Sequence, residues 1–381
     1  MEPTLIAIWI AIAALITAYS AVLIRACITF NLKTERPGET FTENNGISVV
    51  IPFRNEAEKM KRLALCLKEL DTTGLNAELI LVNDHSTDLG RQLVEEYLKD
   101  CTLEARVIDL SEDEKGKKAG IRKGIENSRY DVVATLDADC RPGRLWLESM
   151  LETMNKTGAE LLTGPVRYTA EKRLNTLAVY QQMENAVLMA ITQKQCEQGN
   201  AVIGNGANLC FKKQAYWQAE RIRTDKLIAG GDDIFLLEAI EKLHPGKIGF
   251  AGMKHAIVET DTEKSWGALY VQRVRWAAKV RFQTKPGGFV WQTAAFIFSL
   301  LYAGFVLVCA ARMYWLLFFS VQGLKFIADV MIVSRPAKEL NYKLPFILQL
   351  IASIIQPFIV VAVGCKARYG QFNWKDRLLK A

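Results

Sequence analysis

Two carboxylates one residue apart, Asp137 and Asp139, follow an apolar run in the stretch ATLDADCRPG (134–143). Side chains with this spacing at the end of a strand can hold one divalent cation between the protein and a diphosphate. Proteins usually bind Mg²⁺ and Mn²⁺ with one or two carboxylates together with substrate phosphates. The pair is also compatible with an ordinary junction between a strand and a turn, so its meaning depends on its surroundings.

Polar groups follow two other apolar runs of the chain. Arg54, Asn55 and Glu56 come directly after ISVVIPF, and Asp84 ends ELILVND. Any one of these groups could cap the helix that follows it. Ligands of open parallel sheets bind beyond the carboxyl ends of the strands, so three such groups at one edge indicate a binding site.

The elements that must position these groups alternate between strands and helices, which predicts an α/β domain with a parallel sheet and helices on both faces. The strands are almost continuously apolar, as expected for a sheet buried on both faces. No G-x-G-x-x-G follows the first strand, so a dinucleotide fingerprint is absent, although a mononucleotide could bind. The predicted strands are 47–53, 78–84, 105–110 and 131–139, and the predicted helices are 56–70, 88–100, 117–127 and 233–243.

Hydrophobic segments flank this domain on both sides. The first runs from about Leu5 to Phe30 without a charge before Arg25, which is long enough to span a bilayer. A signal peptide is disfavoured because no basic region precedes the run and because the run exceeds a normal signal core. Three further spans are predicted at about 289–310, 313–333 and 344–364.

Charges beside these segments indicate their orientation. Lys33 and Arg36 follow the first span, which places the α/β domain in the cytoplasm by the positive-inside rule. Three more spans would put the C-terminus outside, yet the tail 366–381 carries five basic residues that favour the cytoplasm. Either one segment is re-entrant or interfacial, or the charge rule fails here. Lys325 and Asp329 lie four residues apart inside a span, as an internal ion pair or as side chains that snorkel to the interface.

Composition excludes several classes of protein. The chain has 381 residues with 48 Lys and Arg against 41 Asp and Glu, a net charge of +7. This mild excess suits a membrane surface or an anionic substrate and is too weak to indicate nucleic-acid binding. None of the eight cysteines has zinc-ligand spacing, so we expect reduced packing residues.

Two segments near the second hydrophobic region could have ordinary structural roles. In GGDD (230–233) an Asp could simply cap the following helix. In 264–286, apolar and aromatic residues recur at helical spacing beside Lys and Arg, which predicts an amphipathic helix at the membrane interface.

Six motifs occur in a fixed order: VVIPFRNEA (49–57), LVNDHSTD (81–88), GKKAGIRKGI (116–125), LDADC (136–140), GGDDIFLL (230–237) and QRVRW (272–276). On these motifs and the hydrophobic flanks, the chain resembles the membrane-integrated family-2 glycosyltransferases. That group includes cellulose, chitin and hyaluronan synthases and ceramide-type glucosyltransferases. The resemblance covers about residues 45–280 and implies a Rossmann-like GT-A nucleotide-sugar domain inserted between transmembrane helices.

The resemblance also implies a role for each matching residue. Asp233 is the implied catalytic base, and Asp139 ligates the metal, with Asp137 beside it at the ribose and phosphate. Lys118, in preference to Lys117, reaches the nucleotide. The remaining implied nucleotide-sugar residues are Pro52, Arg54, Asn55, Glu56, Asp84, Gln272 and Arg275, and the implied acceptor residues are Asp232 and Trp276.

The expected activity follows from these roles. A single base without a covalent nucleophile implies one displacement and inversion at the anomeric carbon. By resemblance, the donor is a UDP-sugar, the cofactor is Mn²⁺ or Mg²⁺, and the product bond is β. Four spans are few for exporting a polymer, so we expect transfer of a single sugar to a membrane lipid at the cytoplasmic face of a bacterial-type plasma membrane. A processive polysaccharide synthase, acting on a glycan acceptor, is the alternative, and a non-catalytic membrane protein that kept the nucleotide-binding fold is the third hypothesis.

The expected domain organisation has five parts. They are a transmembrane helix (1–30), a cytoplasmic catalytic domain (45–263), an interface helix (264–286), about three transmembrane segments (287–365) and a basic tail (366–381).

Overall fold

The computed structural model describes residues 3–38, 46–99, 101–170, 173–223, 232–280, 286–367, 371–374 and 377–380. The chain forms two compact units. The sheet unit comprises 32–169 and 195–261, and the helical unit comprises 1–31, 170–194 and 262–381. Residues 170–194, which the sequence placed in the catalytic domain, thus belong to the helical unit.

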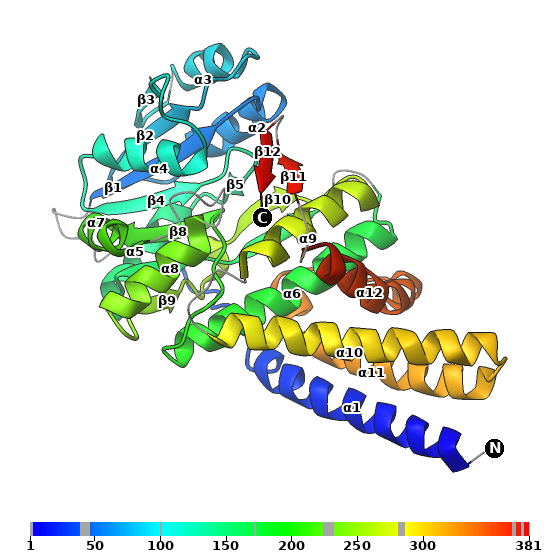
Figure 1. Cartoon of the computed structure of the whole chain (residues 1–381). Coiled ribbons are helices and arrows are strands. Elements are labelled where there is room, and N and C mark those ends of the chain that lie inside the picture. The colour runs from blue at the N-terminus through cyan, green and yellow to red at the C-terminus, as the bar shows by residue number, and fades with distance from the viewer. Residues whose placement is uncertain are drawn as a thin grey trace. The chain divides into compact units, whose positions relative to one another are not determined.

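A seven-stranded sheet forms the centre of the sheet unit (Figure 1). Its strand order is β3-β2-β1-β4-β8-β6-β9. The first four strands in this order are parallel to one another, and β8 is antiparallel to both β4 and β6. The strands are β1 (Gly46–Phe53), β2 (Asn76–Asn83), β3 (Glu104–Asp109), β4 (Val132–Leu136), β6 (Leu161–Thr163), β8 (Asn208–Lys212) and β9 (Ile248–Phe250). The predicted α/β class and its four parallel strands are confirmed. We call the end at which the parallel strands finish the carboxyl edge, and the opposite end the amino edge.

Helices and a small second sheet complete this unit. The helices are α2 (Ala57–Lys68), α3 (Gly90–Leu98), α4 (Lys117–Glu126), α5 (Trp146–Thr157), α7 (Lys213–Ile222) and α8 (Asp232–Leu243), with a 3₁₀ turn at Lys254–Ala256. The second sheet has the order β5-β10-β7, formed by Arg141–Pro142, Val258–Asp261 and Val166–Thr169.

Helix α4 lies unusually close to β1 because it carries two glycines on the contact face. A Cβ at Gly124 would lie 2.3 Å from Val50 Cγ1, and a Cβ at Gly120 would lie 2.8 Å from Pro52 Cβ. Any larger residue at these positions would push the helix off the strand. This close packing fixes the start of α4, and therefore Lys117, at the carboxyl edge.

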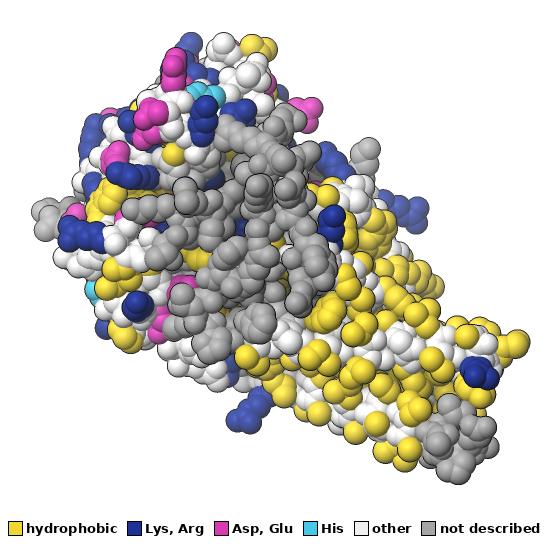
Figure 2. All heavy atoms as spheres, in the orientation of Figure 1, with side chains coloured by type: hydrophobic (Ala, Val, Ile, Leu, Met, Phe, Trp, Pro, Cys, Tyr) yellow, Lys and Arg dark blue, Asp and Glu magenta, His cyan; other side chains and the backbone are white. Residues whose placement is uncertain are grey.

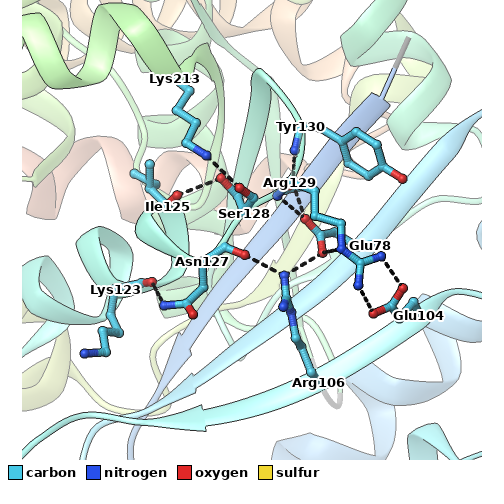
Figure 3. Close-up of polar contacts among 11 residues, drawn as sticks. Glu78, Glu104, Arg106, Lys123, Ile125, Asn127, Ser128, Arg129, Tyr130 and Lys213 are labelled. Atoms are coloured by element: carbon cyan, nitrogen blue, oxygen red, sulfur yellow. Dashed lines mark hydrogen bonds and ion pairs between the residues drawn. The ribbon is translucent and has the colours of Figure 1, made fainter. Parts of the chain in front are cut away.

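Hydrogen bonds and ion pairs connect the amino-edge cluster, which comprises Ser48, Glu78, Glu104, Arg106 and Arg129. Figure 3 shows Glu78 with Glu104, Arg106 and Arg129. Glu78 is 1% exposed and accepts hydrogen bonds from Ser48 Oγ (2.7 Å), the Arg129 backbone N (2.7 Å) and an Arg106 guanidinium nitrogen (2.8 Å). Arg129 also makes a two-pronged ion pair with Glu104 at the surface. The cluster joins the beginnings of all four parallel strands.

Long helices dominate the helical unit. They are α1 (Pro3–Cys27), most of α6 (Thr176–Glu197), α9 (Trp266–Val280), α10 (Pro286–Ala311), α11 (Trp315–Glu339) and α12 (Phe346–Ala367). A hairpin of β11 (Gln371–Trp374) and β12 (Arg377–Lys380) lies in the predicted basic tail, whose Arg368 and Lys375 fall outside the described residues.

All four predicted hydrophobic spans form helices that are long and apolar enough to cross a membrane. The qualifying segments are 7–27, 290–311, 315–339 and 346–367. Figure 2 shows apolar side chains spread over the surface of the long helices. The exposed apolar side chains of α1 and α10 include Ile8, Val22, Leu300 and Leu307. Because lipid tails would cover such a surface without cost, these helices fit a membrane-embedded chain.

Inside this bundle, Lys325 and Asp329 form an internal ion pair, which decides between the two alternatives left open by the sequence. Lys325 is 2% exposed, and its Nζ lies 2.6 Å from Asp329 Oδ2 and 3.0 Å from the Ser353 carbonyl oxygen. Ser353 Oγ in turn donates to Asp329 Oδ2. The pair therefore bridges α11 and α12 instead of reaching the interface.

Candidate active site

The ends of β1 and β2 are bonded to each other at the carboxyl edge. A guanidinium nitrogen of Arg54 donates to the Asp84 carbonyl oxygen at 2.9 Å. Asn55, with a φ of 51°, donates its backbone N–H to Ser86 Oγ and accepts the Thr87 N–H through Oδ1 at 2.8 Å. The positive φ is tolerable because Asn adopts the left-handed region more readily than most residues. Three predicted nucleotide-site residues thus lie together on two neighbouring strand ends.

Asp84 connects these strand ends to the start of α4. It is 4% exposed, and its Oδ2 accepts the Gly116 N–H at 3.1 Å, while its Oδ1 lies 4.0 Å from Arg54. A carboxylate that holds the amide just before a helix also complements the positive end of the helix dipole. Asp84 therefore fixes where Lys117, the first residue of α4, enters the site.

The two aspartates that follow β4 each pair with a lysine. Lys117 Nζ lies 2.5 Å from Asp137 Oδ1, and Lys59 Nζ lies 3.5 Å from Asp139 Oδ2 and 3.1 Å from Glu56 Oε2. Burial raises the pKa of Asp137; the Lys117 ammonium opposes this rise and the nearby Asp139 carboxylate adds to it. The side chains of Asp137 and Asp139 are still about one-third exposed, at 34% and 38%. They are more accessible than the side chains of Asp84 and Glu56 at the same edge, which are 5% and 15% exposed.

Asp233 reaches the same place from α8. Its Oδ2 accepts the Gly206 N–H at 3.0 Å, and its Oδ1 accepts the Ile234 N–H at 2.8 Å. A Cβ at Gly206 would lie 3.3 Å from both Asp233 Oδ2 and Lys117 Nζ. Lys117, Asp137, Gly206 and Asp233 therefore gather at one point, although they come from four different segments.

A cavity of about 280 Å³ opens beside this point. Its walls come from α4, α7, α8 and the sheet, and Lys117, Gly206 and Asp233 are among its lining residues. Apolar, cationic and acidic side chains line it, among them Ile121, Leu209, Phe211, Leu236, Lys115, Lys118, Arg122, Arg223, Glu114 and Glu220. A mixed apolar and charged lining of this size suits one small ligand group.

The family model described as Glycosyl transferase family 2 matches residues 48–219, from β1 to α7. This segment is a family-2 glycosyltransferase domain. The resemblance inferred from the six motifs is thereby confirmed. Asp84, Lys117, Asp137 and Asp139 lie within the matched segment, and Asp233 lies beyond it.

Two curated relatives are similar to this chain in sequence. The chain is 28% identical over 123 residues to Glycosyltransferase AglE of Haloferax volcanii, covering 32% of this chain and 40% of that protein. It is 27% identical over 241 residues to poly-β-1,6-N-acetyl-D-glucosamine synthase of Staphylococcus epidermidis, covering 61% of this chain and 54% of the synthase. The chain thus spans about half the length of the curated relatives it matches.

A solved structure shows the same fold over almost the whole chain. The mannosyltransferase PcManGT from Pyrobaculum calidifontis, determined with GDP-Man and Mn²⁺, superposes with a TM-score of 0.60 at 17% identity. The match covers 92% of this chain and 98% of that one. The predicted Rossmann-like GT-A fold is therefore confirmed.

The glycosyltransferase domain offers carboxylate oxygens as ligands for a divalent cation. Among the described residues, no group of three or more His, Cys, Asp or Glu side chains gathers around one point. Asp137 and Asp139 instead provide two hard oxygen donors that are partly exposed. This arrangement fits Mg²⁺ or Mn²⁺ held jointly by the protein and by substrate phosphates, which complete the coordination shell.

Three predicted site residues, Gln272, Arg275 and Trp276, lie on α9 of the helical unit. Gln272 donates to Glu263 Oε1 at 2.7 Å and accepts from Arg273. The Arg273 guanidinium lies 4.2 Å from the centre of the Trp276 ring. The predicted helix of 264–286 is thus present over 266–280, and Arg273 contacts the side chains of both Gln272 and Trp276.

The structure brings forward Lys117, which the sequence ranked below Lys118. Lys117 pairs with Asp137, while Lys118 Nζ lies 5.6 Å from the centre of the Phe235 ring. It also adds Lys59 and Gly206, which the sequence did not single out. The glycine-rich stretch IGNGAN (203–208) could have indicated a close backbone approach at Gly206. The side chain of Asp232, the first residue of α8, lies outside the described residues.

Proposed function

We propose that this chain is an inverting glycosyltransferase that moves a sugar from a UDP-sugar to a membrane-lipid acceptor and forms a β-glycosidic bond. The reaction takes place at the cytoplasmic face of a bacterial-type plasma membrane and requires Mn²⁺ or Mg²⁺. The observation that carries this proposal is the gathering of Lys117, Asp137 and Asp233 beside Asp139 at the carboxyl edge.

The strand ends are suited to hold the nucleotide and its diphosphate. Arg54, Asn55 and Asp84 form a bonded platform for the base and ribose, with Pro52 and Glu56 beside it. Asp139, with Asp137, would hold the divalent cation, which when bound neutralises the charge that develops on the leaving diphosphate. The Lys117 ammonium, fixed by the close packing of α4, adds positive charge at the same place.

Asp233 is suited to be the base. The Gly206 N–H fixes the position of its Oδ2, and the N-terminal end of α8 stabilises the negative charge of the carboxylate. A carboxylate in this position can take the proton of the incoming acceptor hydroxyl, which contributes typically ~10²–10⁴-fold to the rate. Because the site has one such base and no covalent nucleophile in its proposed machinery, the anomeric configuration inverts.

A lipid acceptor is supported by the helical unit. Its four long apolar helices suit a bilayer, and α9 carries aromatic and cationic side chains typical of a membrane interface. In the proposal, Gln272 and Arg275 contribute to donor binding, and Trp276 and Asp232 contribute to acceptor binding. The described residues include four such apolar helices, which on their own leave little room for a polar path through the bilayer and so favour transfer of a single sugar.

A processive polysaccharide synthase is the second candidate. The similarity to poly-β-1,6-N-acetyl-D-glucosamine synthase favours it, because that relative matches a larger share of this chain than AglE does. On this alternative the acceptor is the growing glycan, and the helical unit would guide the polymer outward.

The test uses the full chain reconstituted in lipid vesicles with Mn²⁺ or Mg²⁺. Nucleotide release is measured with a panel of UDP-sugars and GDP-mannose, and with diacylglycerol, polyprenyl phosphate or a short N-acetylglucosamine oligomer as acceptor. We expect UDP release that stops with EDTA, and one discrete glycolipid. A ladder of products would support the synthase instead, and no nucleotide release with any pair would contradict both.

A further inference from the structure

Helix α6 carries polar side chains that hold other parts of the helical unit. Gln193 makes two reciprocal hydrogen bonds of 3.2 Å with the backbone of Asn31, just after α1. Asn185, which is 2% exposed, donates to the Tyr342 hydroxyl at 2.8 Å in the segment between α11 and α12. Because buried polar groups need partners with correct geometry, each contact fixes one element in a defined place.

The strongest of these contacts connects α6 to α9. Glu184 Oε2 accepts from Arg273 Nε at 2.7 Å, and a second guanidinium nitrogen lies 2.5 Å away. Arg273 is 6% exposed, and its guanidinium lies 4.2 Å from the centre of the Trp276 ring. A planar guanidinium held at one side by a carboxylate can orient the aromatic ring on which it stacks.

A second contact from α6 reaches the same helix through Glu263. The Gln181 side chain donates to the Glu263 carbonyl oxygen at 3.1 Å and accepts its N–H at 2.8 Å. The Glu263 carboxylate then accepts from Gln272 at 2.7 Å. Two of the three proposed site residues on α9 are therefore oriented from α6.

The ion pair is not needed merely to pack the two helices. Tyr180 of α6 and Trp266 of α9 already meet edge to face, with ring centres 5.8 Å apart. A buried ion pair often stabilises a protein no more than an apolar pair of the same size, since both charges lose their water. What Glu184 and Arg273 provide beyond packing is a fixed direction for the indole of Trp276.

We propose that Glu184 is a positioning residue for the transfer reaction, which acts through Arg273 to hold Trp276 in the orientation that receives the acceptor. This inference rests on the proposed acceptor role of Trp276. It assigns Glu184 to acceptor binding and not to donor binding or to the chemical step.

The test compares Glu184→Gln and Arg273→Lys in the full chain in lipid vesicles, using the donor and the acceptor probe that give product in the panel above. Glu184→Gln removes the charge, and Arg273→Lys keeps the charge but loses the planar stack. We expect both variants to raise the acceptor KM about tenfold, the size of one desolvated cation–π contact, and Glu184→Gln to leave the donor KM unchanged. The emission of Trp276, obtained by subtracting a Trp276→Phe background, should shift in both.

Glu339→Gln is the matched control, because Glu339 forms an ion pair of 3.1 Å with Arg335, four residues earlier on α11 of the same unit. The inference would be overturned if Glu184→Gln had the same acceptor and donor KM as this control and if the emission of Trp276 were unchanged. Wild-type transfer by Asp233→Asn would instead overturn the proposed base. In that case the Trp276 emission still decides: a shift supports the positioning role, and no shift overturns it.

Discussion

The carboxylates at the two edges of the seven-stranded sheet differ in their exposure and in their bonding partners. At the amino edge, Glu78 is 1% exposed and accepts three hydrogen bonds, one of them from Arg106. At the carboxyl edge, Asp137 and Asp139 are about one-third exposed, and each pairs with a lysine. The nearby Asp139 contributes to the raised pKa of Asp137.

This difference separates a carboxylate that stabilises the fold from one that can take a ligand. A buried carboxylate whose oxygens are all occupied has nothing left to offer a substrate, and its loss leaves buried partners unsatisfied. Carboxylates that lie near one another and remain partly exposed repel each other until a cation arrives. On the proposed function, the same residue type therefore has a structural role at one end of the strands and a binding role at the other.

The largest expected effect is at the carboxyl edge. Asp139→Asn should reduce sugar transfer about 10²–10³-fold, because it removes the cation ligand that stabilises the leaving diphosphate. The thermal midpoint should change little, since the variant removes both the repulsion from Asp137 and the exposed ion pair with Lys59. The test measures the transfer rate, Mn²⁺ binding by electron paramagnetic resonance, and the thermal midpoint of the variant.

Asp88→Asn is the matched control at the same edge. The Asp88 carboxylate accepts the N–H groups of Ala57 and Gly90, and so serves local structure. The Asp88→Asn substitution should therefore lower the thermal midpoint and leave Mn²⁺ binding intact. Equal loss of Mn²⁺ binding in both variants would contradict the assignment of Asp139.

The amino edge should show the reverse pattern. Glu78→Gln should lower the free energy of unfolding of the sheet unit by about 2–3 kcal/mol, because buried donors of Ser48 and Arg129 lose a charged acceptor. The kcat of the folded protein should not change. Glu104→Gln, at the surface of the same cluster, is the control and should leave the denaturation midpoint unchanged. A drop in kcat with unchanged stability would show that the two edges are not separate in function.

The adjacent lysines of α4 allow a finer comparison within the carboxyl edge. Lys117→Met should raise the donor KM about tenfold, because one charge-assisted contact to the diphosphate is lost. Lys118→Met should have a smaller effect, since Lys118 lies over Phe235. Donor titrations of the two variants give both KM values. A larger effect at Lys118 would support the sequence-based prediction that Lys118 reaches the nucleotide.

The smallest effect is expected at Gly206. Gly206→Ala would place a methyl group 3.3 Å from Asp233 Oδ2 and from Lys117 Nζ, so both side chains must shift by a few tenths of an ångström. A misplaced base lowers kcat, and we expect a loss of severalfold without a change in thermal midpoint. An unchanged kcat would show that Asp233 need not be held this closely.

The parallel strands and their polar ends could be predicted from sequence because both signals are local. Apolar runs of β1, β2 and β4 end in Arg54, Asp84 and Asp137, and parallel strands must finish at one edge. Asp233 was predicted as the base from its motif. The spacing of Lys325 and Asp329 left two alternatives, an internal ion pair or side chains that reach the membrane interface.

The remaining site features depend on tertiary contacts. Lys117 and Lys118 are adjacent on a helix and point about 100° apart, so only the close packing of α4 on β1 decides which one faces Asp137. Helix α6 was not predicted, because its buried polar residues, such as Gln181, break the apolar periodicity that marks a helix. The hydrogen-bond partners of these residues are distant in sequence, as Glu263 is from Gln181.

The central claim is that Asp233 is the base of a transferase whose chemistry lies at the carboxyl edge. The most direct measurement is the rate of donor-dependent sugar transfer by Asp233→Asn in lipid vesicles, together with its thermal midpoint. We predict a loss of at least about 10²-fold with the thermal midpoint essentially retained. Transfer at the wild-type rate by the folded variant would contradict the account.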